Sequence, residues 1–242
     1  MRALVTGASR GIGEATARHL AEDGADVALH FNRHRSEAEE VLADIERRGG
    51  HGFLVSGDLG VPSEVNDLVR QIKSRWRSMD VLVHNAGSYP RVKFRDLTPH
   101  ELRAVFEVHV FGPAKLTQGL LPLLDESEAG RVIFVSSVLA FTGSRQGAPY
   151  AAAKAAVLGL ARSLSRELAP SITVNVIAPG SIDTAVLEGD TPTQRAERNR
   201  SIPLGRVGDP AEVAEAIAFL ASPKASYLTG TTLHVNGGLR LD

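Results

Sequence analysis

Near its amino end the chain carries the stretch that decides its fold, Ala3-Leu4-Val5-Thr6-Gly7-Ala8-Ser9-Arg10-Gly11-Ile12-Gly13. Its apolar start predicts a buried strand. Gly7 permits a sharp turn into a helix, while Gly11 and Gly13 leave room where backbone must approach a pyrophosphate or pack tightly on a sheet. The spacing Gly-x-x-x-Gly-x-Gly differs from the common dinucleotide motif, and a tight turn without a ligand is the alternative. We interpret the stretch as a nucleotide-binding turn, because a strand precedes it and Arg10 lies within it.

Short strand-like runs alternate with helical patterns along the rest of the chain. The predicted strands lie at residues 3–6, 26–31, 52–56, 81–84, 131–136, 173–177 and 231–235. Parallel strands need crossover connections, so this alternation predicts an α/β fold with a parallel sheet and helices on both faces. Because ligands bind at the carboxyl ends of such strands, we expect Gly7, Asn85, Ser137 and Pro179 to converge on one site.

The stretch from 181 to 206 is irregular and rich in Thr, Pro, Glu and Arg. A loop of this length after the carboxyl end of a strand is usually functional, so we expect a mobile lid insertion over the site. An ordinary surface excursion is the alternative. No linker divides the chain, and 242 residues with 43% hydrophobic content suffice for one domain spanning residues 1–242.

Composition narrows the function classes. The chain has 27 basic and 28 acidic residues, which gives no charge excess that would favour nucleic acid or a membrane as partner. It has no cysteine, which excludes disulfides, thiolate catalysis and cysteine-based zinc sites, and we predict no metal site. We find no signal-peptide pattern and no apolar run long enough to span a bilayer, so we expect a cytoplasmic protein.

The run Tyr150-Ala151-Ala152-Ala153-Lys154 carries the chemistry, thirteen residues after Ser137. Alanine-rich sequence predicts a helix from 150 to 161, and a spacing of four places the phenol and the ammonium on one face. A nearby ammonium favours phenolate and lowers a tyrosine pKa from about 10 toward working pH. Tyr150 is therefore a candidate general acid or base, and a buried tyrosine with a solvated lysine is the alternative.

Several motifs occur together in one order. They are Thr6-Gly7-x-x-x-Gly11-x-Gly13, Asn85-Ala86-Gly87, Ser137 with Tyr150-x-x-x-Lys154, Pro179-Gly180 with Thr184, and the ending Val235-Asn236-Gly237-Gly238. In order and spacing this set resembles the short-chain dehydrogenase/reductase family over nearly the whole chain. The resemblance implies a Rossmann-type, doubly wound, seven-stranded parallel sheet, a nicotinamide cofactor and a homotetramer.

The resemblance also implies roles for the catalytic residues. Ser137 would donate a hydrogen bond to the substrate oxygen, Tyr150 would deliver its proton during carbonyl reduction, and Lys154 would bind the nicotinamide ribose and lower the tyrosine pKa. The chain departs from the family at His109, where many members have an Asn whose main-chain carbonyl holds a relay water. We include His109 as a fourth catalytic candidate, and a buried structural histidine is the alternative.

The end of the second predicted strand indicates the cofactor. It reads His30-Phe31-Asn32-Arg33-His34-Arg35 and lacks the acid that NAD-preferring relatives use to bind the ribose 2′-hydroxyl. Arg33, with Arg10 and Asn32, could bind a 2′-phosphate through charge-assisted hydrogen bonds, so we predict NADPH. The predicted cofactor-binding residues are Gly7, Ser9, Arg10, Gly11, Ile12, Gly13, Asn32, Arg33, Asp58, Leu59, Asn85, Ala86, Gly87, Tyr150, Lys154, Pro179, Gly180, Ile182 and Thr184.

The substrate is less defined. Within the family the chain is most similar to 3-oxoacyl-[acyl-carrier-protein] reductases, which implies reduction of a 3-oxoacyl thioester in fatty acid or polyketide metabolism. Relatives dock an acidic carrier with basic residues before the fifth and sixth strands, where this chain has Glu126-Ser127-Glu128 and Ala169-Pro170-Ser171. Another small ketone, a quinone or a pterin is the alternative substrate. A non-catalytic nucleotide sensor and a structural interaction protein are alternatives of other classes.

Candidate substrate contacts follow the predicted strand ends. They are Ser88, Tyr89, Arg91, Phe94, Leu139, Phe141, Gln146, Val186 and Leu187. Any of them could instead be a packing or loop residue.

Overall fold

A single parallel sheet forms the centre of the protein in the computed structural model, which describes residues 1–187 and 189–241. Its seven strands are β1 Arg2–Val5, β2 Asp26–Phe31, β3 His51–Ser56, β4 Val81–His84, β5 Gly130–Val135, β6 Ile172–Pro179 and β7 Thr232–Val235. Their order across the sheet is β3-β2-β1-β4-β5-β6-β7. The winding reverses between β1 and β4, and that reversal opens a crevice at their carboxyl ends. The predicted fold class is confirmed.

Helices connect the strands and cover both faces of the sheet. The α-helices are α1 Gly11–Glu22, α2 Arg35–Arg47, α3 Pro62–Arg75, α4 Pro99–Phe106, α5 Gly112–Asp125, α6 Leu139–Thr142, α7 Ala148–Glu167, α8 Pro192–Ser201 and α9 Pro210–Ala221. Short 3₁₀ turns lie at η1 Phe94–Asp96, η3 Ala185–Leu187 and η4 Pro223–Ala225, and a π-helical turn, η2, spans Glu107–Phe111.

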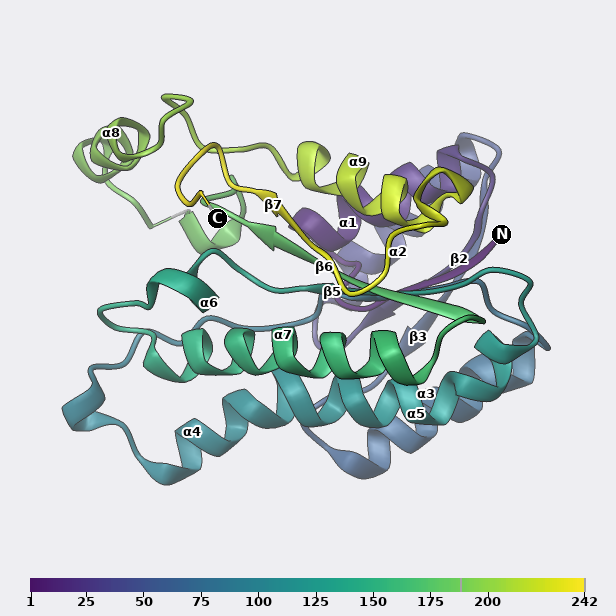
Figure 1. Ribbon diagram of the computed structural model, residues 1–242. Helices are drawn as coiled ribbons and strands as arrows, with labels where there is room; N and C mark the ends of the chain where they lie inside the picture. The colour runs from purple at the N-terminus through teal and green to yellow at the C-terminus, as the bar shows by residue number, and fades with distance from the viewer. Residues whose placement is uncertain (188, 242) are drawn as a thin grey trace.

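Figure 1 shows the two helical layers, with α1, α2 and α9 on one face of the sheet and α3, α5 and α7 on the other. Each layer buries its own apolar core. Leu20, Val41 and Ile217 belong to the first core. Leu68, Leu120 and Val157 belong to the second. Strands buried on both faces carry nearly continuous apolar runs, which is why they were recognisable in the sequence.

The strand predictions differ from the observed bounds by only one or two residues. The helix expected from Tyr150 is also present, since α7 spans Ala148–Glu167 with Pro149 in its first turn. Proline fits that position because the first amides of a helix have no intrahelical acceptor.

The segment 181–206 is more regular than expected. It contains η3 and the helix α8, whose first turn is closed by a capping box between Thr191 and Gln194. The sequence suggested irregular structure because α8 buries none of its residues and so has no apolar periodicity. In Figure 1, α8 lies away from the two helical layers, at the end of the molecule where the strands have their carboxyl ends.

Candidate active site

A cleft of about 1300 Å³ lies at the carboxyl ends of the strands. Every residue predicted to bind the cofactor lines it, with the exception of Gly13. Ser137, Tyr150, Lys154 and His109 line it as well. The topology therefore brings to one place the residues that the sequence scattered over about 180 positions.

The turn after β1 needs glycine because other parts of the chain lie close to its backbone. Gly7 has a φ of +66°, and a Cβ there would lie 2.8 Å from the Cα of Ala86. A Cβ on Gly13 would lie 2.1 Å from the carbonyl oxygen of Gly7, so Gly13 serves the packing of α1 against the turn. Because α1 begins at Gly11 beside the cleft, its unpaired amides and positive dipole end suit a pyrophosphate.

Hydrogen bonds of Thr6 and Asn85 join that turn to the loop after β4. The Thr6 hydroxyl donates to the Val83 carbonyl at 3.1 Å and accepts from the amides of Asn85 and Ala86. The Asn85 side-chain amide donates to the carbonyl oxygens of Thr6 at 2.9 Å and Gly7 at 3.2 Å. The loops after β1 and β4 are thus one hydrogen-bonded unit, and the side chain of Asn85 supports the glycine turn.

Two arginines lie at the rim beside the end of β2. Arg10 and Arg33 are exposed, line the cleft and are accompanied there by Asn32. Within residues 1–187 and 189–241, neither guanidinium is engaged in an ion pair or hydrogen bond. Both can therefore reach a phosphate without first giving up another partner.

Ser137, Tyr150 and Lys154 meet at the base of the cleft. Ser137 follows β5, accepts a hydrogen bond from the Leu139 amide at 3.1 Å and is hydrogen bonded to Tyr150. The Lys154 ammonium nitrogen lies 5.5 Å from the centroid of the Tyr150 ring. It donates to the Val135 carbonyl at 2.7 Å. The predicted placement of phenol and ammonium on one helix face is confirmed.

The protonation of these groups differs from expectation. Burial raises the pKa of Tyr150 to about 12, although the hydrogen bond with Ser137 acts in the opposite direction. Burial also lowers the pKa of Lys154 to about 8. The expectation that the tyrosine pKa falls toward working pH is wrong for this arrangement, because burial has the largest effect and the Lys154 ammonium donates its hydrogen bond to the Val135 carbonyl. Tyr150 is consequently a phenol at neutral pH, the form that donates a proton.

His109 lies in the π-helical turn η2 and is only 3% exposed. Its Nε2 is 2.8 Å from the carbonyl oxygen and 3.2 Å from the amide nitrogen of Ser88. Its ring covers Gly87, where a Cβ would lie 2.2 Å from the ring Cε1, and stands edge-on to Tyr150 at 5.2 Å. Burial, aided by the charge of Lys154, lowers the pKa of His109 to about 3. The ring is thus neutral at physiological pH and anchors the loop after β4.

Tyr89 lines the cleft beside Tyr150. Its ring packs edge-on to Tyr150 at 4.8 Å, and its hydroxyl lies 2.7 Å from the Ser144 hydroxyl. A Cβ on Gly147 would lie 2.5 Å from the Tyr89 ring, so the ring is closely held.

Six of the nine predicted substrate contacts line the cleft, namely Ser88, Tyr89, Arg91, Leu139, Gln146 and Leu187. Two do not. Phe94 is 77% exposed on η1, and Phe141 packs against His234 at 5.0 Å. The side chain of Val186 lies outside the described residues.

Comparison with known proteins agrees with this geometry. The family model described as enoyl-(acyl carrier protein) reductase matches residues 7–240. The chain is 37% identical over 238 residues to the 3-oxoacyl-[acyl-carrier-protein] reductase FabG of Staphylococcus aureus, covering 98% of this chain and 97% of the relative. The chain belongs to the short-chain dehydrogenase/reductase family. The predictions of this family and of an oxidoreductase are confirmed.

Two solved structures of high similarity also bear on the fold. The angucycline C-6 ketoreductase LanV with bound NADP has a TM-score of 0.92 and 37% identity, covering 98% of this chain and 95% of its own. A blue fluorescent protein from a metagenomic library in complex with NADPH has a TM-score of 0.93 and 33% identity, covering 99% and 98%. None of the described helices of this short-chain dehydrogenase/reductase is long and apolar enough to span a bilayer.

Sequence reasoning missed two supports of the site. Thr6 and His30 are both buried and hydrogen bonded to the loops that line the cleft. The available signal was a polar residue at the end of a strand that is otherwise apolar. A buried polar group needs a partner, and the nearest partners at a strand end are the amides and carbonyls of neighbouring loops.

Proposed function

We propose that the protein reduces a 3-oxoacyl thioester to the 3-hydroxyacyl form with NADPH. The observation that carries the proposal is the meeting of Ser137, Tyr150 and Lys154 at the base of a cleft that also contains the glycine turn. The FabG relative supports the substrate class, since its name specifies a 3-oxoacyl group on a carrier protein.

The prediction of an NADP-type cofactor is confirmed at the level of the family, because similar proteins were solved with NADP and NADPH. We infer that the Gly7–Gly13 turn holds the pyrophosphate. Arg10, Asn32 and Arg33 would hold the 2′-phosphate, and Asp58 and Leu59 would flank the adenine. The site fits such a group, because the amino end of α1 lines the cleft at Gly11 and the Arg10 and Arg33 guanidinium groups have no other partner among the described residues.

The chemistry needs a hydride and a proton. Bound NADPH supplies the hydride. Tyr150 is protonated at working pH and hydrogen bonded to Ser137, so the two hydroxyls can together hold the substrate carbonyl oxygen and Tyr150 can release its proton to it. The Lys154 ammonium lies close enough to stabilise the phenolate that results.

Arg33→Asp tests the cofactor assignment. We expect NADPH affinity to fall at least tenfold and NADH affinity to hold or rise, because the carboxylate repels a 2′-phosphate and accepts from a 2′-hydroxyl. Fluorescence titration with both cofactors measures the change. Arg35→Asp is the matched control, since Arg35 pairs with Glu39 one turn into α2 and does not line the cleft. An unchanged NADPH preference in Arg33→Asp would show the assignment to be wrong.

A second candidate is the reduction of a free ketone. Glu126 and Glu128 are exposed before β5, where an acidic carrier would meet like charge. The LanV relative is named as a ketoreductase of an angucycline rather than of a carrier-bound group. NADPH oxidation with acetoacetyl-carrier protein, acetoacetyl-CoA, small ketones, quinones and pterins separates the two. Turnover of the free ketones alone would favour the second candidate, and cofactor binding without any turnover would favour a nucleotide sensor.

We further propose that residues 181–206 form a lid of the single domain. Thr184, Leu187 and Gln194 line the cleft. Ion pairs of Arg198 with Asp190 and of Arg195 with Asp183 join α8 to the chain before it, so the segment can move as one unit. Slower limited proteolysis within 181–206 when NADPH is added would support the lid.

Family membership also predicts a homotetramer. Light scattering of the protein in solution tests this prediction of its oligomeric state.

A further inference from the structure

His30 lies at the carboxyl end of β2 and is 2% exposed, yet it lines the cleft. Its main-chain carbonyl accepts from the Ala8 amide at 2.8 Å. The residue is therefore placed between the turn after β1 and the loop after β3. No role in the reaction proposed above requires it.

Both ring nitrogens of His30 are used, and their partners fix the tautomer. The Gly7 amide can only donate, so Nδ1 accepts its hydrogen bond at 3.1 Å. The Gly57 carbonyl can only accept, so Nε2 carries the proton and donates at 2.9 Å. Burial lowers the pKa of His30 to about 4, which is consistent with a neutral ring that has one donor and one acceptor.

The two hydrogen-bond partners of the His30 ring, Gly7 and Gly57, belong to loops that are proposed to bind different parts of the cofactor. Gly7 begins the turn proposed to hold the pyrophosphate, and Gly57 precedes Asp58 and Leu59 beside the proposed adenine position. The spacing between these loops decides whether one ligand can contact both. Apart from the ring, these loops contact β2 through backbone hydrogen bonds, Ala8 to the carbonyl of His30 and Gly57 to the carbonyl of Phe31 at 3.2 Å.

We propose that His30 is a positioning residue for the cofactor, with its neutral ring setting the distance between the pyrophosphate turn and the adenine loop. The inference rests on the proposed NADPH function. It assigns to His30 an effect on cofactor affinity in addition to its part in the core.

Three substitutions separate the two hydrogen bonds. The side-chain oxygen of Asn can take the place of Nδ1 and keep the bond from Gly7, whereas the longer amide of Gln can take the place of Nε2 and keep the bond to Gly57. Leu keeps neither. We expect the Kd for NADPH, measured by fluorescence titration, to rise about threefold in His30→Asn and His30→Gln and about tenfold in His30→Leu, a change equivalent to about 1.4 kcal/mol.

His84→Leu is the matched control. His84 is likewise a buried histidine at the end of a strand, 4% exposed, and its Nε2 hydrogen bonds to the Thr117 hydroxyl at 2.7 Å. It is not among the residues that line the cleft. We expect His84→Leu to lower the melting temperature as much as His30→Leu while leaving the NADPH Kd within twofold of the wild-type value.

The outcomes are distinct. A folded His30→Leu protein that binds NADPH like the wild type would overturn the inference, and so would equal loss of affinity in His84→Leu, because the effect would then be a general one of the core. If His30→Leu does not fold, the Asn and Gln variants carry the same test, and unchanged affinity in both overturns the inference. A wild-type protein that binds no NADPH would overturn the proposed function and this inference with it.

A second readout needs no cofactor. Nitrogen NMR of the histidine rings distinguishes a neutral ring protonated at Nε2 from one protonated at Nδ1 or at both. We expect the first form for His30 throughout pH 5.5 to 8. Either of the other forms at pH 7 would contradict the assigned hydrogen bonds and overturn the inference.

Discussion

Burial acts on Tyr150 and Lys154 in the same way, by favouring the uncharged form of each. It raises the pKa of the phenol to about 12 and lowers the pKa of the ammonium to about 8. The phenol therefore keeps its proton over the whole working range, while the charge of Lys154 is lost in mildly alkaline solution. The proposed reduction uses the proton of Tyr150 and is favoured by the charge of Lys154, so we expect the ionisation of Lys154 to set its alkaline limit.

Tyr150→Phe tests the proton donor. We expect kcat for carbonyl reduction to fall by about 10³-fold or more, a loss within the range of general acid catalysis. The NADPH Kd should stay within threefold, because the ring and its contacts with Tyr89 and His109 remain. Residual activity above a tenth of wild type would assign the proton to another group.

The pH profile of the wild type tests Lys154. We expect kcat for reduction to be level from pH 6 to about 7.5 and to fall above an apparent pKa near 8, as Lys154 loses its proton. Lys154→Arg should move the fall to higher pH, because a guanidinium stays charged there. A wild-type profile that is level up to pH 9.5 would contradict the role given to the ammonium.

His109→Asn tests whether the histidine moves protons or holds a loop. A ring that titrates near pH 3 cannot shape the profile above pH 5, so we expect the same pH profile in the variant. The KM for the carbonyl substrate should rise threefold to tenfold, since Ser88 loses its hydrogen bond to the ring and Tyr150 loses its edge-on contact with it. A tenfold increase in kcat, or a new ionisation between pH 5 and 8, would argue for a role in proton transfer.

At the scale of elements, the sequence predicted the structure well where a single physical cause determines which residue type can occupy a position. The apolar strands and the glycine turn predicted the sheet and the cleft correctly, and the spacing of Tyr150 and Lys154 predicted that the two side chains lie together. The helix α8 was missed, since it buries none of its residues. The direction of the Tyr150 pKa shift was wrongly predicted because burial has the largest effect on it, and the burial of one side chain is set by tertiary contacts that the spacing does not reveal.

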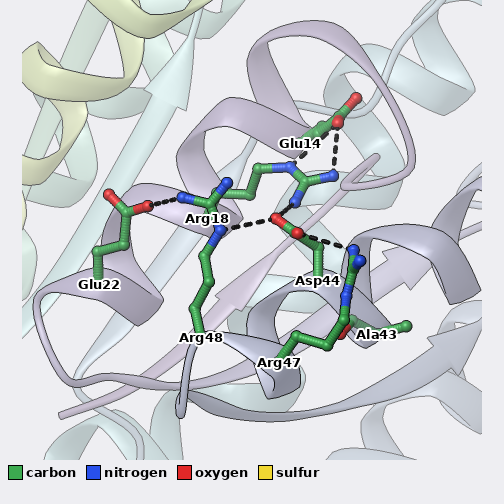
Figure 2. A network of polar contacts seen from close by, with 7 residues as sticks. All are labelled: Glu14, Arg18, Glu22, Ala43, Asp44, Arg47 and Arg48. Carbon is green, nitrogen blue, oxygen red and sulfur yellow. Dashed lines mark hydrogen bonds and ion pairs between the residues drawn. The ribbon is translucent and has the colours of Figure 1, made fainter.

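A network of ion pairs joins α1 to α2 on the outer face of the first helical layer (Figure 2). Arg18 of α1 bridges Glu14 and Asp44, and Asp44 of α2 also pairs with Arg47 and Arg48. The Asp44 side chain is 17% exposed, which makes it the shielded centre of the network. The two helices joined here begin beside the cleft, α1 at Gly11 and α2 directly after His34.

Asp44→Asn tests this network. Removing the shared carboxylate charge leaves three arginines near one another, and we expect the free energy of unfolding to fall by about 1–2 kcal/mol. Urea denaturation at low salt measures it. Asp67→Asn is the control, because Asp67 pairs only with Arg70 in the described structure and its side chain is 51% exposed. Equal effects in the two variants would show that the network adds nothing beyond ordinary surface pairs.

At the scale of the whole molecule, three neutral histidines are buried along the edge of the sheet that carries the site. Burial lowers the pKa of His30 to about 4 and the pKa values of His84 and His109 to about 3. In the unfolded chain each would titrate near 6.5. Between these values the unfolded state binds protons that the folded state does not, so the free energy of unfolding falls as the pH falls.

We therefore expect the three buried histidines to make the folded state less stable in acid. From about pH 6 down to pH 5, each histidine lowers the free energy of unfolding by about 1.4 kcal/mol per pH unit, and the three together by about 4 kcal/mol per unit. Since a domain is stable by only about 5–15 kcal/mol, we expect cooperative unfolding between pH 4 and 5. Urea denaturation at pH 5 to 7 measures the slope, and His84→Gln should reduce it by about one third. An unchanged slope in that variant would mean that His84 is charged in the folded protein or that carboxylates dominate the acid transition.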